Sequence, residues 1–428
     1  MNTFFEKVAT VFRDPTLRKR ILFTIGALII FQFLASIPIP GVNKAKLVTF
    51  FANNQFLGLL NVFSGGGLSN LSIVMLGVSP YITGSIIMQL VTMMSPTIKA
   101  MYQEEGEAGR RKFAQYGRLL TVPLALVSGF GFILLLEQQG IVGTLSLFSL
   151  ITNIMIIVSG SVMLLWLGEL ITEFGIGNGV SLIIFSGIVA RIPQTISQTA
   201  FSFSQSDIPF YIFFVAVAVL IVYAVVYVTE AERPVAVTYA KQVRGNKVYG
   251  GVSTYLPLRL TQAGVIPIIF ALSLLLFPQL ILNFLSKITL TGAIGVFITN
   301  ASTTLLNLLN NQLVYGITYF FLVVFFTYFY TAVTFDPESI SKNLQQGGAF
   351  IPGVRPGEAT TVHLSKIVTR ITLVGALFLG GIAVLPLILK AVSGITSLAI
   401  GGTALLIVVS VVLDLIKKID AQISMREY

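Results

Sequence analysis

The sequence contains no cysteine and only one histidine, and charged residues make up just 10% of its 428 positions. Without cysteine there are no disulfides, thiolate metal sites or cysteine nucleophiles. The single histidine, His363, has no second imidazole with which to build a zinc site, so we interpret it as a surface residue. The HExxH, GxSxG and GxxxxGKS/T patterns of metalloproteases, serine hydrolases and P-loop proteins are also missing. These absences argue against an enzyme and against a bound cofactor or metal.

Apolar residues dominate the chain, at 55% of positions with a mean hydropathy of +0.89, which indicates an integral membrane protein. A helix needs roughly 20 apolar residues to cross about 30 Å of hydrocarbon. The sequence has ten stretches near that length, so we predict an all-α membrane protein with ten transmembrane helices. The predicted spans are residues 21–37, 74–94, 118–136, 151–172, 180–196, 209–229, 263–285, 313–335, 367–389 and 395–416. The more polar segment 290–310 is expected outside the bilayer.

Positive charge is distributed unevenly between the two predicted sides of the membrane. Most of the 27 Lys and Arg residues fall in the amino terminus, in the connections after the second, sixth and eighth spans, and in the carboxyl tail. Because retained positive charge marks the cytoplasmic side, both termini are expected in the cytoplasm. Arg191 is among the few cations predicted on the opposite side.

A polar connection, residues 191–207, divides the ten spans into two sets of five. Two related halves with an odd number of spans must be inserted in opposite orientations, as in inverted-repeat transporters. We therefore predict an N-terminal half at 1–200 and a C-terminal half at 201–428. This prediction rests on topology, because the two halves show no evident sequence similarity.

The second apolar region is too long for one span. It covers residues 56–94 and is interrupted by three glycines at 65–67 and by Pro80, which disfavour a continuous helix. We predict a short helix over 56–63 that does not span, then a turn and a full span. Non-helical backbone at membrane depth must be surrounded by protein or by a water-filled cavity. The alternative, an ordinary extracytoplasmic loop over 56–70, stays open on the sequence alone.

Two predicted cytoplasmic loops, about 230–262 and 334–366, are long, glycine-rich and basic. In the second, the segment "IPGVRPGEA" places a Pro-Gly pair on each side of Arg355, which restricts the backbone around one cation. Such a loop fits docking of an acidic or phosphate-bearing partner. The alternative is the ordinary positive charge of a cytoplasmic loop.

Few ionisable residues lie within the predicted spans. Glu169 and Glu173 are near the cytoplasmic end of the fourth span, where exposure or structural partners are favoured over ion coordination. An ion-coupled carrier normally keeps such groups or unwound carbonyls at mid-membrane. The near absence of charge therefore argues against ion coupling but allows a pore closed by apolar side chains. A secondary transporter with broken helices remains the alternative function.

Several long motifs, in the same order and across nearly the whole chain, resemble the bacterial members of the SecY/Sec61 alpha family, the channel subunits of the Sec protein translocase. They are "SIPIPG", "FSGGGLSNLSI", "LGVSPYITGSIIMQL", "EGEAGRRK", "WLGELITEFGIGNGVSLIIFSGIV", "LPLRLTQAGVIPIIFA" and "GAFIPGVRPGEAT". The resemblance implies two inverted five-helix halves around an hourglass pore, in the bacterial plasma membrane. It implies a protein-conducting channel for secretory preproteins and signal peptides, with lateral release of transmembrane helices into membrane lipid. The implied partners are SecE, SecG, SecA and the ribosome, whose rRNA the basic loops would contact.

The resemblance also implies functional residues, transferred by matching motifs. An apolar pore ring would consist of Val78, Ile82, Ile184, Ile269 and Ile407. A plug within about 56–72 would include Phe63, Ser64, Gly65, Gly66, Gly67, Leu68, Ser69 and Asn70. A lateral gate between spans two and three and spans seven and eight would include Thr83, Ile86, Thr121, Thr261 and Gln262. Docking of SecA or the ribosome would use Lys241, Arg244, Lys247 and Arg355.

Without the resemblance, each ring residue would be interpreted as ordinary helix-core packing. The chain also departs from the family pattern in two places. The loop after the sixth span has a lone Arg233 beside Glu230 and Glu232, where the family usually has adjacent arginines. Thr261 stands where the family often has Asn. These departures put in doubt the strength of the loop contact and the composition of the gate.

Overall fold

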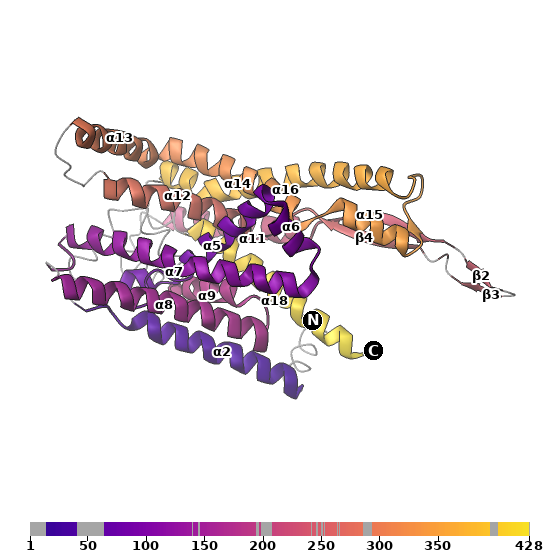
Figure 1. Ribbon diagram of the computed structural model, residues 1–428, viewed down its shortest axis with the longest axis horizontal. Coiled ribbons are helices and arrows are strands. Elements are labelled where there is room, and N and C mark those ends of the chain that lie inside the picture. Colours follow the sequence, from indigo (N-terminus) through magenta and orange to yellow (C-terminus); the bar gives the residue numbers. More distant parts are fainter. Residues whose placement is uncertain are drawn as a thin grey trace. The chain divides into compact units, whose positions relative to one another are not determined.

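The computed structural model is predominantly helical, with five short strands among the residues that it describes (Figure 1). It describes every residue except 1–13, 41–63, 139, 144–145, 194–196, 198–207, 241, 245–246, 250, 252, 263, 265, 286–292, 394–400 and 428. The chain forms two compact units. The first unit comprises Met1–Tyr211, Leu272–Tyr315 and Ile407–Tyr428, and the second comprises Ile212–Ala271 and Gly316–Leu406.

Each of the ten predicted spans overlaps an observed helix, although α7 begins before the predicted third span and α9 ends at Val189, before the predicted end of the fifth. These helices are α2 (Pro15–Ser36), α5 (Ser79–Met94), α7 (Gly106–Gln138), α8 (Leu147–Phe174), α9 (Gly179–Val189), α11 (Ile208–Glu230), α12 (Ile266–Leu285), α14 (Gln312–Thr334), α16 (Glu358–Ser393) and α18 (Gly401–Glu427). Shorter elements are the 3-10 helix η1 (Gly67–Asn70), α6 (Pro96–Gln103) and α15 (Pro337–Gln346). The segment predicted outside the bilayer contains α13 (Ala293–Asn310). By length and composition, α2, α7, α8, α14 and α16 could each cross a membrane, in a search limited to the described residues.

The second predicted span differs from the structure at its beginning. The prediction starts at residue 74, but α5 begins only at Ser79. Gly77 has a φ of 59°, a left-handed conformation that no residue adopts in a right-handed helix, and Pro80 lies in the first turn of α5, where proline is tolerated. The chain between η1 and α5 is therefore a series of turns.

In the first unit, α7 lies between α5 and α8, and α8 also packs against α2 and α9 (Figure 1). The buried side chains between these helices include Phe31, Phe132, Leu164 and Ile171. Apolar residues that face away from them, such as Ile29, Phe33 and Trp166, are exposed. Helices with buried side chains on one face and exposed apolar side chains on the other fit a protein surrounded by lipid.

The second unit contains a small sheet that hydropathy did not indicate. β1 (Glu232–Tyr239) pairs antiparallel with β4 (Ser253–Arg259), and its last two residues pair with β5 (Ala349–Phe350). Val235 and Val237 on one face of β1 are buried with Leu258, Leu364 and Ile371, whereas the residues between them are exposed. β2 (Gln242–Arg244) and β3 (Lys247–Tyr249) form a separate hairpin beyond β4 (Figure 1). The two predicted cytoplasmic loops are thus joined by strand pairing over a shared apolar core.

The corner between α8 and α9 is held by backbone contact at two glycines. The N–H of Gly179 donates to Oγ1 of Thr172 at 2.9 Å, and Asn178 caps α9 by accepting from the N–H of Ser181 at 3.1 Å. A Cβ added to Gly179 would overlap the carbonyl oxygen of Gly168. The two helices can therefore meet this closely only without a side chain at this position.

We expect Gly179→Ala to lower the free energy of unfolding by about 1–3 kcal/mol, because the added methyl group forces the corner apart. Gly131→Ala is the matched control, since a Cβ there has no heavy atom within 4 Å. In a helix interior, that control should be neutral or stabilise by up to about 1 kcal/mol. Denaturant titrations of both variants in detergent would measure the difference, and equal stabilities would contradict the close approach.

Candidate functional site

The described part of the predicted plug, residues 64–72, is here called the plug segment; the remainder of the prediction, residues 56–63 including Phe63, lies outside the described residues. The segment is not an α-helix. Gly65 and Gly66 have φ values of 60° and 91°, which only glycine adopts readily, and η1 follows them. Leu71 ends η1 in the left-handed conformation, with φ 42°. The three-glycine run thus does not continue as an α-helix, as the sequence predicts.

Backbone hydrogen bonds fasten the end of the plug segment to the chain that follows α2. The N–H of Ile39 donates to the carbonyl of Leu71 at 2.8 Å, and the N–H of Ile73 donates to the carbonyl of Ile37 at 3.0 Å. Nδ2 of Asn70 donates to the carbonyl of Ala35, the penultimate residue of α2, at 3.3 Å. The non-helical backbone therefore finds partners within the protein, as it must at membrane depth.

The plug segment is seated against α2 and α9. Ser64, Leu68 and Leu71 have no exposed surface. A Cβ on Gly65 would overlap the ring of Phe31 in α2, and a Cβ on Gly187 in α9 would overlap the backbone of Gly65. The seat thus depends on two backbones meeting without a side chain between them.

The two helices of the seat are also bonded to each other. Nε2 of Gln32 in α2 donates to the carbonyl of Ser186 at 3.2 Å and lies 3.3 Å from its hydroxyl oxygen. The sequence analysis did not identify this pair. A lone glutamine in an apolar helix is the only signal that could have suggested it.

Every residue of the predicted pore ring is buried, with an exposed fraction of 7% or less. Val78 is the residue before α5 and Ile82 lies one turn further on, where its N–H donates to the carbonyl of Val78 at 3.1 Å. Ile184 is in α9, the helix that seats the plug segment. These three residues and Ile407 belong to the first unit, and Ile269 belongs to the second. The ring stays a prediction that spans both units.

Two threonines of the predicted lateral gate, Thr83 and Thr121, form hydrogen bonds within their own helices. Oγ1 of Thr83 donates to the carbonyl of Ser79 at 3.1 Å, and Oγ1 of Thr121 donates to the carbonyl of Gly117 at 3.0 Å. Oγ1 of Thr261 is buried and has no hydrogen-bond partner among the residues that the structure describes. Ile86 is buried in α5 and Gln262 is half-buried in the turn before α12. The lateral gate stays a prediction.

The predicted docking residue Arg355 lies in a rigid, exposed turn. Gly353 and Gly357, on either side, have φ values of 83° and 97°. Oγ1 of Thr360 donates to the carbonyl of Arg355 at 2.8 Å, and the N–H of Val354 donates to the carbonyl of Ile351 at 3.0 Å. The backbone of Arg355 is therefore fixed while its side chain is exposed.

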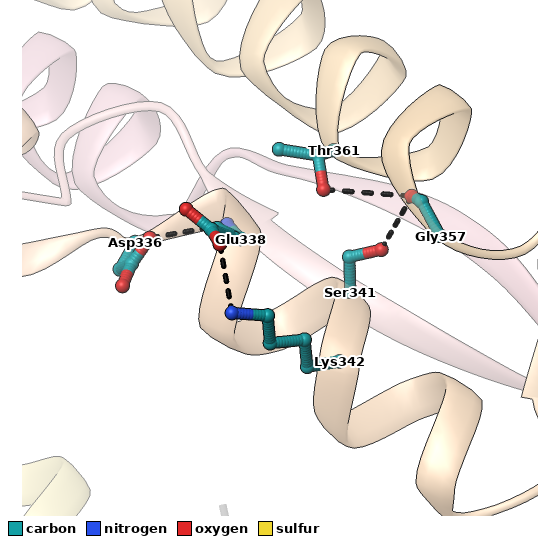
Figure 2. A network of polar contacts seen from close by, with 6 residues as sticks. All are labelled: Asp336, Glu338, Ser341, Lys342, Gly357 and Thr361. Carbon is teal, nitrogen blue, oxygen red and sulfur yellow. Dashed lines mark hydrogen bonds and ion pairs between the residues drawn. The ribbon is translucent and has the colours of Figure 1, made fainter.

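A polar network attaches this turn to α15 and α16 (Figure 2). The carbonyl of Gly357 accepts from the hydroxyl of Ser341 at 2.8 Å and from that of Thr361 at 3.5 Å. On α15, Lys342 and Glu338 form an ion pair at 2.7 Å. Because the Gly357 carbonyl takes bonds from both helices, the turn, α15 and the start of α16 form one unit.

The other predicted docking residues lie at the β2–β3 hairpin. Arg244 and Lys247 end β2 and begin β3, and they are paired in register. Lys241 lies outside the described residues. At the opposite end of the β1–β4 pair from this hairpin, Glu232 forms an ion pair with Arg259 at 3.0 Å, so one of the two carboxylates beside Arg233 is already engaged.

Glu169 has the structural partner that the sequence analysis favoured, since its carboxylate forms an ion pair with Arg118 of α7. No group of three or more His, Asp or Glu side chains in the described part of the chain is arranged to hold a metal ion.

Comparison with known proteins gives one consistent family. The SecY family model matches residues 72–416. Protein translocase subunit SecY of Mycobacterium bovis is 39% identical to the chain, over 100% of this chain and 99% of that protein. The corresponding subunit of Mycobacterium leprae is 40% identical over the same shares. That of Streptomyces coelicolor is 40% identical over 98% of each.

Solved structures show the same fold. One described as a protein conducting channel has a TM-score of 0.65 and 19% identity, covering 95% of this chain and 93% of its own. Canine Sec61 in a ribosome-channel complex from the endoplasmic reticulum has a TM-score of 0.61 and 18% identity over the same shares. These likenesses confirm the predicted fold class of an all-α, multi-pass membrane protein. With the family model and full-length relatives in agreement, the chain belongs to the SecY family.

Proposed function

We propose that this chain is the protein-conducting channel of a bacterial Sec translocon and has no catalytic activity of its own. The observation that carries the proposal is the plug segment, a largely buried stretch that is not α-helical and that precedes Val78 and Ile82 in the chain. A solved SecY with a TM-score of 0.63 and 21% identity is described as having a plug domain that stabilises the closed state and maintains a membrane seal. We infer that the plug segment of this chain likewise keeps the channel closed.

The pore ring would seal around a chain in transit. Apolar walls expel water from a narrow constriction, and flexible branched side chains yield to a passing polypeptide. Segments of about 20 apolar residues would leave sideways through the gate residues, because they partition into hydrocarbon. The N-terminal half at 1–200 and the C-terminal half at 201–428 would then be the two sides of the channel in the plasma membrane.

The cytoplasmic loops would receive the partners that supply unfolded chains and energy. The fixed turn at Arg355 and the β2–β3 hairpin fit SecA or the ribosome, whose acidic and phosphate groups attract a basic surface. SecE and SecG would complete the complex. Canine Sec61 and yeast Ssh1 were solved in ribosome complexes, which supports the ribosome as a partner of this chain. Both termini would lie on the same, cytoplasmic side.

In reconstituted vesicles containing this chain and SecE, we expect uptake of an unfolded secretory preprotein to require SecA and ATP. The chain has no phosphate-binding motif to drive transport itself, so omitting either should abolish uptake. Protease protection of the preprotein is the measurement. Small-solute uptake without SecA or ATP would instead support the secondary transporter.

Replacing Ile82, Ile184 and Ile269 together by Asn should raise ion conductance in a planar bilayer, because amides hydrate the constriction. The triple substitution to Val is the matched control, since it keeps the ring apolar and should leave conductance near its original level. Equal conductance in the Asn and original proteins would show that these residues do not form the seal.

Arg355→Glu should reduce SecA-driven preprotein uptake by at least about tenfold, the effect of losing roughly 1.4 kcal/mol of charge-assisted contact. Thr360→Val, which removes the hydroxyl bonded to the Arg355 carbonyl, should give a smaller loss because the turn loosens. Arg370→Glu, at an exposed position of α16, is the charge-matched control. Uptake that falls equally for Arg355→Glu and Arg370→Glu would argue for general electrostatics instead.

A further inference from the structure

Arg191, two residues beyond the end of α9, is half-buried and contacts the plug segment. Its Nη2 donates to the carbonyl of Gly66 at 3.2 Å and also to Oγ of Ser69. A Cβ added to Gly66 would lie 3.0 Å from Nε of Arg191, tighter than an ordinary van der Waals contact. Glycine at this position therefore lets the guanidinium lie directly against the plug backbone.

The three groups form a closed set of hydrogen bonds. The hydroxyl of Ser69 donates to the carbonyl of Gly66 at 2.8 Å, which leaves its oxygen lone pairs free to accept from Arg191. The Gly66 carbonyl accepts from both side chains. Hydrogen bonds from an ionised donor are roughly twice as strong as neutral ones, so the guanidinium bonds are the strongest polar contacts described for the segment.

Other directional bonds, made by Asn70 and Leu71, hold the end of the plug segment to the carboxyl-terminal end of α2 and the chain that follows it. Burial of Leu68 and Leu71 is apolar and therefore non-directional. The bond from the Leu68 N–H to Oγ of Ser64 lies within the segment itself. Arg191 instead joins the glycine run to the end of α9 and fixes its position along that helix.

We propose that Arg191 is a positioning residue that latches the plug segment in its seat, through its bonds to Gly66 and Ser69, and so sets how readily the channel opens. This inference rests on the proposed function of residues 64–72 as the plug. The latch adds a directional contact between the glycine run and the end of α9, and this contact must break before the segment can leave its seat.

The absence of cysteine from the chain permits a direct measurement of plug release. Leu68→Cys places one thiol where the parent side chain has no exposed surface, and a membrane-impermeant maleimide reports its exposure in reconstituted vesicles. In this background, Arg191→Ala should raise the modification rate at least about tenfold, the factor expected from losing charge-assisted bonds. Lys390→Ala, which removes one of the other cations predicted on the same side, is the control and should leave the rate unchanged.

Two further variants separate the latch from a general structural effect. Arg191→Lys should give an intermediate rate, because an ammonium keeps the charge but not the planar fork of donors. Ser69→Ala should also raise the rate, and combining it with Arg191→Ala should add little, since both remove the same contact. Midpoints of thermal unfolding should stay similar across the set.

Unchanged modification rates for both Arg191→Ala and Ser69→Ala would overturn the latch, as would fully additive effects of the two. If Arg191→Ala does not fold, the Lys and Ser69 variants carry the same test. Deleting residues 64–72 should raise ion conductance in a planar bilayer. Failure of that deletion to leak would overturn the plug function itself, whereas a leaking deletion with unchanged Arg191 variants would overturn the latch alone.

Discussion

Backbone that leaves the helical conformation at membrane depth must have its N–H and C=O groups satisfied by protein, because hydrocarbon offers no partner. The plug segment meets this constraint through the extended chain after α2, which exchanges backbone bonds with Leu71 and Ile73. It also requires close neighbours, and Gly187 supplies one by letting α9 touch Gly65. α2, α9 and the plug segment therefore depend on one another, and the proposed seal is a property of all three.

The same arrangement would make the proposed closure stable but reversible. Leu68 and Leu71 are fully buried, and exposing a side chain of this size costs about 1.5–3 kcal/mol. A segment held only by such burial, by a few hydrogen bonds and by glycines can leave as a unit without unfolding a helix. In the proposed opening, an arriving signal sequence would have to offset a cost of a few kcal/mol for these two side chains.

Hydropathy located all ten spans, because a run of about 20 apolar residues is a strong signal. It placed the start of α5 too early, since averaged hydropathy does not register the left-handed backbone at Gly77. It also missed the β1–β4–β5 sheet, where only two valines alternate with exposed residues before the chain turns. The ring residues Val78 and Ile184 cannot be told from ordinary core by residue type, and Arg191 bonds a backbone carbonyl, which leaves no trace in sequence. The resemblance to the SecY family identified the predicted ring residues, whereas the contact between Arg191 and the plug segment is visible only in the structure.

The length of α16 has a mechanical consequence. Its 36 residues form a rod of about 54 Å, and its first turn is tied to the Arg355 loop by Thr360 and by the bonds at Gly357. A helix is stiff along its axis, so a load applied to the loop acts on the whole rod. Pro386, near the far end, is the natural point for it to bend. A partner that pushes on this loop would therefore move the amino-terminal part of α16 as a rigid body.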